Sequence, residues 1–334
     1  MKTKSLYMHN LLRLTFVSAG LILLTGLAFG QNDKIAQALE ALKDENLDQA
    51  KVLIDEAAAH EQTSKLAHTW YYRGYIYNAI YKRDKNINGP ERSLSIDYFK
   101  KSMDIEPDGK YGANSKSSIM NISRTFYNDC VIYLNAKDPE KAHKSFKIYL
   151  EKIVIGDPTI DLKPRKIDVY LALGGMYTNL YELNKRTNST YWGLAKHYFE
   201  LVLELDPENL NGNYNVGILF YNKAVNIING TDYDIDLVAL SDIQDTSITL
   251  FKQSLPFMET ALELEPENEN TLIGLSGIYF ALNEHEKSDA IKDRLKKLKE
   301  HCKGKTDEGN DCQTKTKNTN GYCDKHQNQV KDKK

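Results

Sequence analysis

One internal pattern recurs five times along the chain, and this repetition constrains the fold more than any single motif does. A small residue is followed three positions later by an aromatic residue, most clearly in Gly74 with Tyr77, Gly174 with Tyr177 and Gly217 with Phe220. A second apolar segment follows each pair, and three of these segments end in an acidic residue plus proline, at 106–107, 206–207 and 265–266. Each unit of such a repeat can bury its apolar face only against its neighbours, so the pattern predicts stacked helix pairs.

The repeated segments resemble tetratricopeptide repeats, whose 34-residue unit is a helix–turn–helix. The positions that match the family pattern in successive units are Trp70, Gly74, Tyr77, Phe99 and Pro107; Phe126, Cys130, Tyr133, Ala142 and Phe146; Tyr170, Leu173, Gly174, Tyr177, Ala195, Phe199 and Pro207; Asn213, Val216, Gly217, Phe220, Ala261 and Pro266; and Leu272, Leu275, Ser276, Tyr279 and Ser288. A weaker opening unit contains Ala38, Ala50, Ile54 and Ala57. The resemblance implies an all-α right-handed superhelix of about six helical hairpins over residues 31–300, followed by a small Cys-rich tail.

The pattern has local physical reasons. The small residue lets the two helices of a hairpin approach closely, and the aromatic three positions later fills the space beside it. Proline after the second helix stops it, because proline cannot continue the hydrogen-bond ladder. Asp138 and Pro139 form a helix start, with a capping carboxylate followed by proline in the first turn.

The small residues at 74, 130, 174, 217 and 276 lie further apart than 34 residues. We expect the excess to form loops between the helices of a unit, at Arg83–Glu91, Asn184–Tyr191 and Asn229–Asp245. Doubling the length of a surface loop costs only about 0.6 kcal/mol. These insertions are therefore compatible with the fold, either as spacers or as functional loops.

The N-terminus has the features of a secretory signal peptide, expected over residues 1–30. Lys2, Lys4 and Arg13 precede the uncharged apolar run Leu14–Phe29, which ends in small residues. An uncleaved anchor is the competing interpretation, because the run is only slightly shorter than a membrane span. No later stretch is comparably apolar, so we expect an exported chain in the periplasm or cell envelope of a bacterium, without a membrane span after cleavage.

Charge and motifs argue against two classes of function. The 44 basic and 46 acidic residues give a net charge of −2, whereas a nucleic-acid-binding body normally carries a basic surface. The chain has no phosphate-binding loop and no His-Glu-x-x-His motif, and its serines lack the glycines of a hydrolase nucleophile elbow. We therefore expect neither nucleic acid as a partner nor an enzyme.

In the family, the first helices of the repeats line a concave groove. The residues at the corresponding positions, predicted to form the partner-binding groove, are Tyr71, Tyr75, Asn78, Arg124, Tyr127, Asn179, Tyr214, Tyr221, Asn222, Asn270 and Phe280. Tyrosine rings and amides suit an extended peptide or protein segment. Packing of these tyrosines between adjacent helices is the alternative.

Three individual residues narrow the functional interpretation. Tyr71 and Tyr127 occupy positions where chaperone-binding members of the family would carry lysines, which argues against a clamp for a C-terminal carboxylate. Cys130 takes the place of the small residue in its unit. We interpret it as a buried small hydrophobe rather than a reactive thiol.

The tail, residues 301–334, contains a candidate metal site. Cys302, Cys312, Cys323 and His326 offer three thiolates and one imidazole, a complete tetrahedral set for structural zinc. The tail also looks like a short Cys-Cys-Cys-His module of bacterial and phage proteins. Two alternatives stay open: one disulfide with an odd thiol, as export favours, or a disordered polar segment.

The sequence thus predicts an exported scaffold or adaptor that binds protein partners in its groove. The alternative is a metal-dependent recognition module in the tail, for which the repeat array serves as a spacer. Truncation after Glu300 distinguishes the two.

Overall fold

The computed structural model describes residues 33–185, 187–231, 234–299, 303–314, 316 and 321–329. These residues form helices joined by short connections, and their extended pairing is a single isolated bridge between Lys305 and Asp311. The α-helices cover 33–43, Leu47–Ala59 (α2), Ala67–Asp84 (α3), Glu91–Ile105 (α4), Lys110–Asn135 (α5), Pro139–Gly156 (α6), Lys163–Leu183 (α7), Ser189–Leu205 (α8), Leu210–Asn229 (α9), Leu237–Leu264 (α10), Glu269–Ala281 (α11) and His285–Lys299 (α12). Short 3-10 helices cover Thr63–Lys65 (η1) and Asp324–Gln329 (η2). The predicted all-α class is confirmed.

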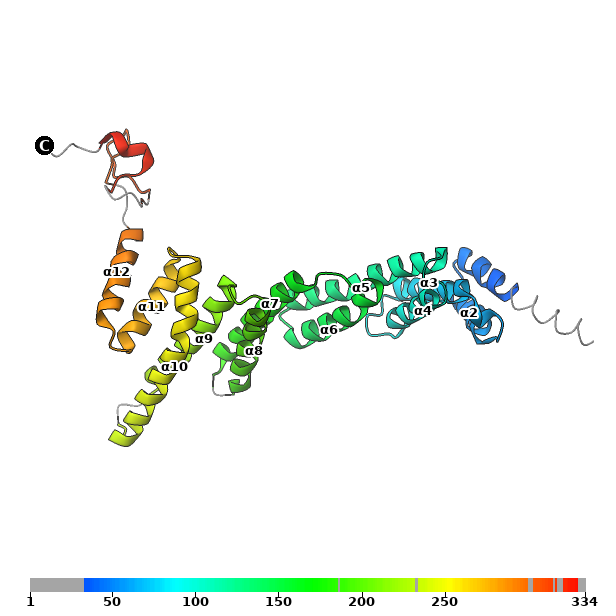
Figure 1. Ribbon diagram of the computed structural model, residues 1–334, viewed down its shortest axis with the longest axis horizontal. Helices are drawn as coiled ribbons and strands as arrows, with labels where there is room; N and C mark the ends of the chain where they lie inside the picture. The colour runs from blue at the N-terminus through cyan, green and yellow to red at the C-terminus, as the bar shows by residue number, and fades with distance from the viewer. Residues whose placement is uncertain are drawn as a thin grey trace, which may run out of the picture. The chain divides into compact units, whose positions relative to one another are not determined.

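Consecutive helices pair into hairpins within two compact units, which divide between Asp161 and Leu162. In the first unit, helix 33–43 packs on α2 through a shared apolar cluster, α3 on α4, and α5 on α6. In the second unit, α7 packs on α8, α9 on α10, and α11 on α12 (Figure 1). The described chain therefore contains the predicted helical hairpins, while the handedness of a superhelix stays a prediction.

The small residue of the repeat has the expected role. A Cβ atom added to Gly74 would lie 2.9 Å from the ring of Phe99, on the partner helix. The same atom on Gly217 would lie 2.5 Å from Met258 Cγ. Cys130 is fully buried at the equivalent place in its hairpin. In these hairpins the side chain is kept small because the partner helix occupies the space.

The predicted helix boundaries are also present. Asp138 caps α6 by accepting a hydrogen bond from Lys141 N at 3.0 Å, and Pro139 is the first helical residue. Helices α4, α8 and α10 end at the acidic residue that precedes proline: their C-caps are Glu106, Asp206 and Glu265.

The wide spacing of the repeats is only partly explained by loops. Between α3 and α4 the expected insertion is present, and α8 begins at Ser189, within the expected loop Asn184–Tyr191. The predicted loop Asn229–Asp245 is wrong over its second half, because α10 begins at Leu237 and has 28 residues. Asp236 starts this helix by accepting a hydrogen bond from Ala239 N at 2.8 Å. Similarly, α5 begins at Lys110 and has 26 residues.

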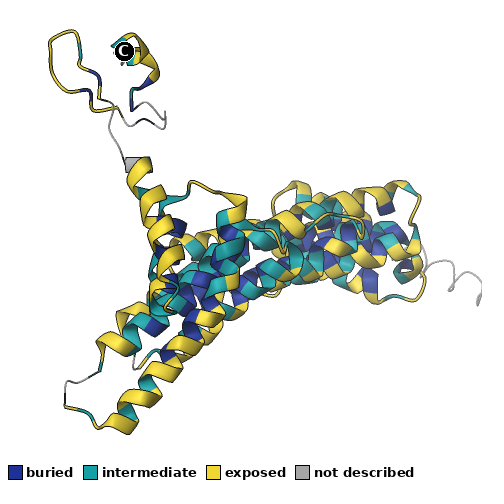
Figure 2. Ribbon diagram, turned by 60° about the vertical axis from the view of Figure 1, so that its left-hand side comes forward, coloured by how far each residue is buried: buried dark blue, intermediate teal, exposed yellow. Residues whose placement is uncertain are grey.

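The inner faces of the hairpins form the core (Figure 2). One buried ion pair links the second hairpin to the third: Arg92 on α4 lies 2.6 Å from the carboxylate of Asp129 on α5. The same guanidinium lies 3.7 Å from the ring centroid of Phe126 and donates a hydrogen bond to Tyr81 Oη. The pair fixes the α3–α4 hairpin to α5.

The predicted signal peptide lies outside the described residues. None of the described helices combines the length and apolar character that a membrane span requires.

Candidate functional site

First helices of successive hairpins contact one another within each unit. In the first unit α3 contacts α5, and in the second unit α9 contacts both α7 and α11. We call these two surfaces the first-unit wall (α3 and α5) and the second-unit wall (α7, α9 and α11). The first-unit wall carries the predicted residues Tyr71, Tyr75, Asn78, Arg124 and Tyr127. The second-unit wall carries Asn179, Tyr214, Tyr221, Asn222, Asn270 and Phe280.

The predicted wall residues differ in exposure. Tyr75 and Phe280 are open to solvent, with 48% and 59% of their surface exposed. Arg124, Asn179 and Asn270 are exposed as well. The others are half-buried: Tyr71, Asn78, Tyr127, Tyr214, Tyr221 and Asn222.

Tyr71 belongs to an aromatic cluster that joins α3 to the start of α5. Its ring centroid lies 5.3 Å from that of Tyr72 and 5.5 Å from that of Tyr111. Tyr111 also lies 5.7 Å from the ring of His68. Burial raises the pKa of Tyr71 and lowers the pKa of His68, while a hydrogen bond with Tyr111 raises the pKa of Tyr72. The cluster is neutral, aromatic and only partly covered, and the exposed Tyr75 lies one helical turn from Tyr71 on α3.

Other wall tyrosines pack between helices. Tyr127 lies 5.3 Å from the ring of Tyr149 on α6, and Tyr221 lies 5.7 Å from the ring of Phe251 on α10. The ring of Tyr71 likewise lies 5.6 Å from that of Phe99 on α4. For these three residues the alternative interpretation, packing inside a hairpin, describes part or all of their contacts.

Tyr72 and Tyr111 were not predicted from the sequence as members of the aromatic cluster. Tyr111 lies on the N-terminal extension of α5, ahead of the segment that matches the repeat pattern. A helical period was present in Tyr111, Ser115, Ile119 and Ile122, the last three of which are buried. That period could have placed Tyr111 on the α5 face that meets α3.

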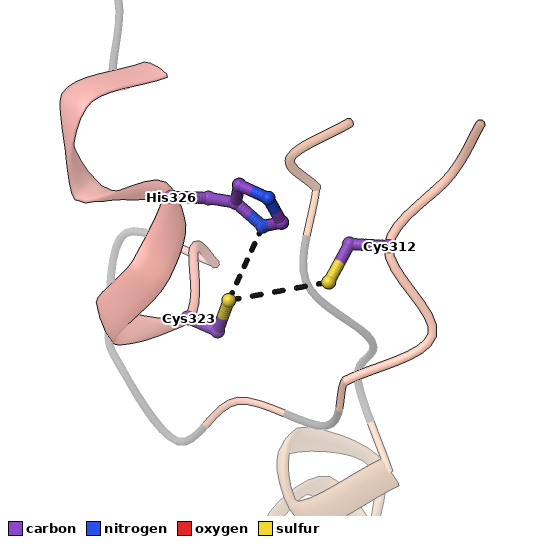
Figure 3. Close-up of side chains that lie close together, drawn as sticks. All are labelled: Cys312, Cys323 and His326. Atoms are coloured by element: carbon purple, nitrogen blue, oxygen red, sulfur yellow. Dashed lines mark hydrogen bonds between the residues drawn. The ribbon is translucent and has the colours of Figure 1, made fainter. Parts of the chain in front are cut away.

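The tail brings three of its four predicted ligands together (Figure 3). Cys312 Sγ lies 4.0 Å from Cys323 Sγ, which lies 3.2 Å from His326 Nδ1. Both cysteines are 6% exposed. The fourth predicted ligand, Cys302, lies outside the described residues.

Glycines and backbone contacts position these ligands. Gly304 faces His326, whose Cβ would lie 2.5 Å from an added Cβ, so no side chain fits there. Cys312 N donates a hydrogen bond to Gly304 O at 2.9 Å. Gly321, two residues before Cys323, has φ of +78°, a conformation that favours glycine.

These distances fit one tetrahedral ion. Two thiolates bound to zinc at about 2.3 Å lie about 3.8 Å apart in a tetrahedral arrangement. The sulfurs are not joined to each other here, since a disulfide requires about 2.05 Å. The described part of the tail therefore presents a Cys-Cys-His cluster at metal-binding distance.

Cys130 is a different kind of cysteine. Burial raises the pKa of its thiol to about 12, so the thiol is protonated at neutral pH. The interpretation as a small buried hydrophobe agrees with this environment.

No family model matches the chain, and no curated protein matches it either. Similar solved structures include PilF of Pseudomonas aeruginosa, with 14% identity, 80% of this chain and 91% of that chain covered, and a TM-score of 0.34. A monomeric mutant of IFIT1 with Gppp-AAAA has 12% identity, 77% and 58% coverage, and a TM-score of 0.35. YrrB, a TPR protein with an unusual peptide-binding site, has 16% identity, 72% and 88% coverage, and a TM-score of 0.25. With scores this low, the fold assignment rests on this chain's own hairpins.

Proposed function

We propose that this chain is an exported scaffold that binds a protein partner as an extended segment along a first-helix wall. The observation that carries the proposal is the half-exposed aromatic cluster of Tyr71, Tyr72 and Tyr111 beside the open ring of Tyr75. Rigid rings supply contact area at low conformational cost, and their hydroxyl groups can pair with a peptide backbone.

Export supports a partner in the bacterial periplasm or cell envelope. This part of the proposal rests on the N-terminal sequence alone, on the basic residues Lys2, Lys4 and Arg13 ahead of the apolar run.

Site-specific photocrosslinking in the native cells tests the wall. Benzoylphenylalanine replaces Tyr75 on the wall or, as a control, Val154 on the second helix α6, which is 37% exposed. We expect a discrete crosslinked protein from position 75 and none from position 154. Equal crosslinking from both positions, or none from position 75, contradicts the proposal.

A second candidate function belongs to the tail, because Cys312, Cys323 and His326 converge. In this alternative the tail binds a structural zinc ion and provides metal-dependent recognition, with Cys302 as the fourth ligand. Structural zinc contributes about 10 kcal/mol or more to a small module, enough to fold a segment with almost no apolar core.

Metal analysis of the full-length, reduced protein tests this candidate. We expect one zinc per chain, and a cobalt-substituted protein with thiolate charge-transfer absorption. Cys323→Ser should lose both, whereas Cys130→Ser, the matched control outside the tail, should keep both. A reduced wild-type chain without stoichiometric metal rejects the zinc site, and unchanged partner capture by Cys323→Ser rejects recognition by the tail.

A further inference from the structure

The long helix α10 extends past the short helix α11 (Figure 1). Helix α10 has 28 residues and α11 has 13. Helix α11 therefore covers only the C-terminal half of α10, and the N-terminal half of α10 lacks a covering helix on that side. That half projects together with the end of α9, and exposed residues dominate its surface (Figure 2). We call this segment, residues 237–251, the α10 overhang, and the residues that lead into it, 234–236, its tip.

An apolar groove follows the α10 overhang. It has a volume of about 610 Å³ and lies between α10, the end of α9 and the end of α11. The α10 residues that line it are Leu240, Ile243, Gln244, Ser247, Ile248 and Phe251. Their spacing of three and four residues makes one continuous helix face.

Large apolar side chains are exposed around this groove. Leu240 is 38% exposed and Ile248 37%, while Ile228 from α9 and Phe280 from α11 are 47% and 59% exposed. Leu237, in the first turn of α10, is 83% exposed. Scattered apolar residues are ordinary on a surface, but a contiguous group of this kind marks an interaction site.

A second feature of the groove is an unpaired buried hydroxyl. Ser247 is 3% exposed, and its hydroxyl has no hydrogen-bond partner among the described residues. A buried hydroxyl without a partner costs about 1–3 kcal/mol.

Charge identifies the chemistry of the occupant. Residues 224–251 contain five aspartates and no lysine or arginine. Asp234 and Asp236 are exposed at the tip of the α10 overhang, and Asp236 lies one helical turn from Leu240. At the opposite edge Lys292 lies 5.5 Å from the ring of Phe280 and is paired with Asp289. The tip is therefore acidic, and it complements a basic segment.

We propose that the groove of the α10 overhang binds an amphipathic helix of a partner protein, whose apolar face packs on Leu240, Ile248 and Phe280 and whose basic end meets the acidic tip. A helix laid in an apolar groove makes contacts at i, i+3, i+4 and i+7, the same period as the groove's own wall. This site is separate from the extended-peptide mode proposed for the walls, and Phe280 is the one predicted wall residue that it shares.

The test measures binding of designed peptides to the full-length chain by fluorescence anisotropy. The probe is a 16-residue helical peptide with leucines on one face and lysines at one end. Its controls are a scrambled peptide of equal composition and an otherwise identical peptide with glutamates at that end. We expect the basic amphipathic peptide to bind at least about tenfold more tightly than either control, with an affinity that falls as salt is added.

Matched variants locate the site. Leu240→Glu should weaken binding at least about tenfold, because it places a charge in the apolar groove, whereas Leu194→Glu on α8, where the leucine is 37% exposed, should leave it unchanged. Equal binding of all three peptides, or equal effects of the two variants, overturns the proposal. Sedimentation of the free chain tests whether a second copy of the chain occupies the groove instead. A dimer that Leu240→Glu dissociates makes the groove a self-association surface and also overturns the proposal. Leu240 is not a predicted wall residue, so the result of this test does not depend on the result of the crosslinking test at position 75.

Discussion

Two adjacent glycines in α7 allow a sharp test of the packing that defines the repeat. An added Cβ atom at Gly174 would overlap the ring of Phe199 on α8, and this ring is 2% exposed and cannot move into solvent. At Gly175 an added Cβ atom would meet nothing within 4 Å. The same substitution, Gly→Ala, therefore tests helix propensity alone at Gly175, and helix propensity together with the close approach of α8 at Gly174.

The expected magnitudes follow directly. Alanine in a helix interior is more favourable than glycine by about 1 kcal/mol, so Gly175→Ala should stabilise the second unit by up to that amount. Gly174→Ala gains the same propensity but loses about 1–3 kcal/mol through overpacking against Phe199. The propensity term cancels in the comparison, so Gly174→Ala should be about 1–3 kcal/mol less stable than Gly175→Ala.

Urea denaturation measures this difference. The chain has two tryptophans, Trp70 in the first unit and Trp192 on α8 in the second. A Trp70→Phe background leaves the fluorescence of Trp192 as the reporter of the unit that contains both glycines. Equal free energies of unfolding for the two variants would refute the close approach of α7 and α8 at Gly174.

The remaining predictions concern buried groups. Arg92→Met should lower the free energy of unfolding by about 3–5 kcal/mol, because it leaves the Asp129 carboxylate buried without its cation. The double variant with Asp129→Leu should recover much of that loss. An Arg92→Met variant as stable as the wild type contradicts the pairing. The pKa of Cys130 is raised to about 12 in the folded protein. As pH rises, the thiol of the unfolded chain therefore ionises before that of the folded chain, from about pH 8.5. The contribution of this thiol to the free energy of unfolding is lost between about pH 8.5 and 12. Cys130→Ala should flatten that part of the stability–pH profile, and an unaltered slope excludes the effect. Gly304→Ala should lower zinc affinity at least about tenfold in a chelator competition, because the added methyl displaces His326; unchanged affinity means that the histidine is not a ligand.

Much of the fold could be predicted from the sequence because the repeat fixes local contacts. The contact of Gly74 with Phe99 lies within one hairpin and the cap at Asp138 lies within one helical turn, and both are present. The lengths of α5 and α10 were not predicted, since the repeat pattern covers only part of each helix. Their extensions contain polar residues such as Asn114 and Asp242, which also occur in loops.

The candidate sites were predictable to different degrees. Cys312, Cys323 and His326 were found from ligand chemistry and spacing, and the fold brings them together. The wall residues were predicted from their positions in the family pattern, and these positions give no information on how far each side chain is buried. Tyr75 is exposed, whereas Tyr127 packs on Tyr149.

The central claim is that partners bind to the first helices of the hairpins. Hydrogen–deuterium exchange of the full-length chain, alone and with the protein crosslinked from position 75, tests it most directly. We predict that the partner slows exchange in α3 and α5, with little change in α4 and α6. Protection confined to the second helices or to residues 303–329 would contradict the account.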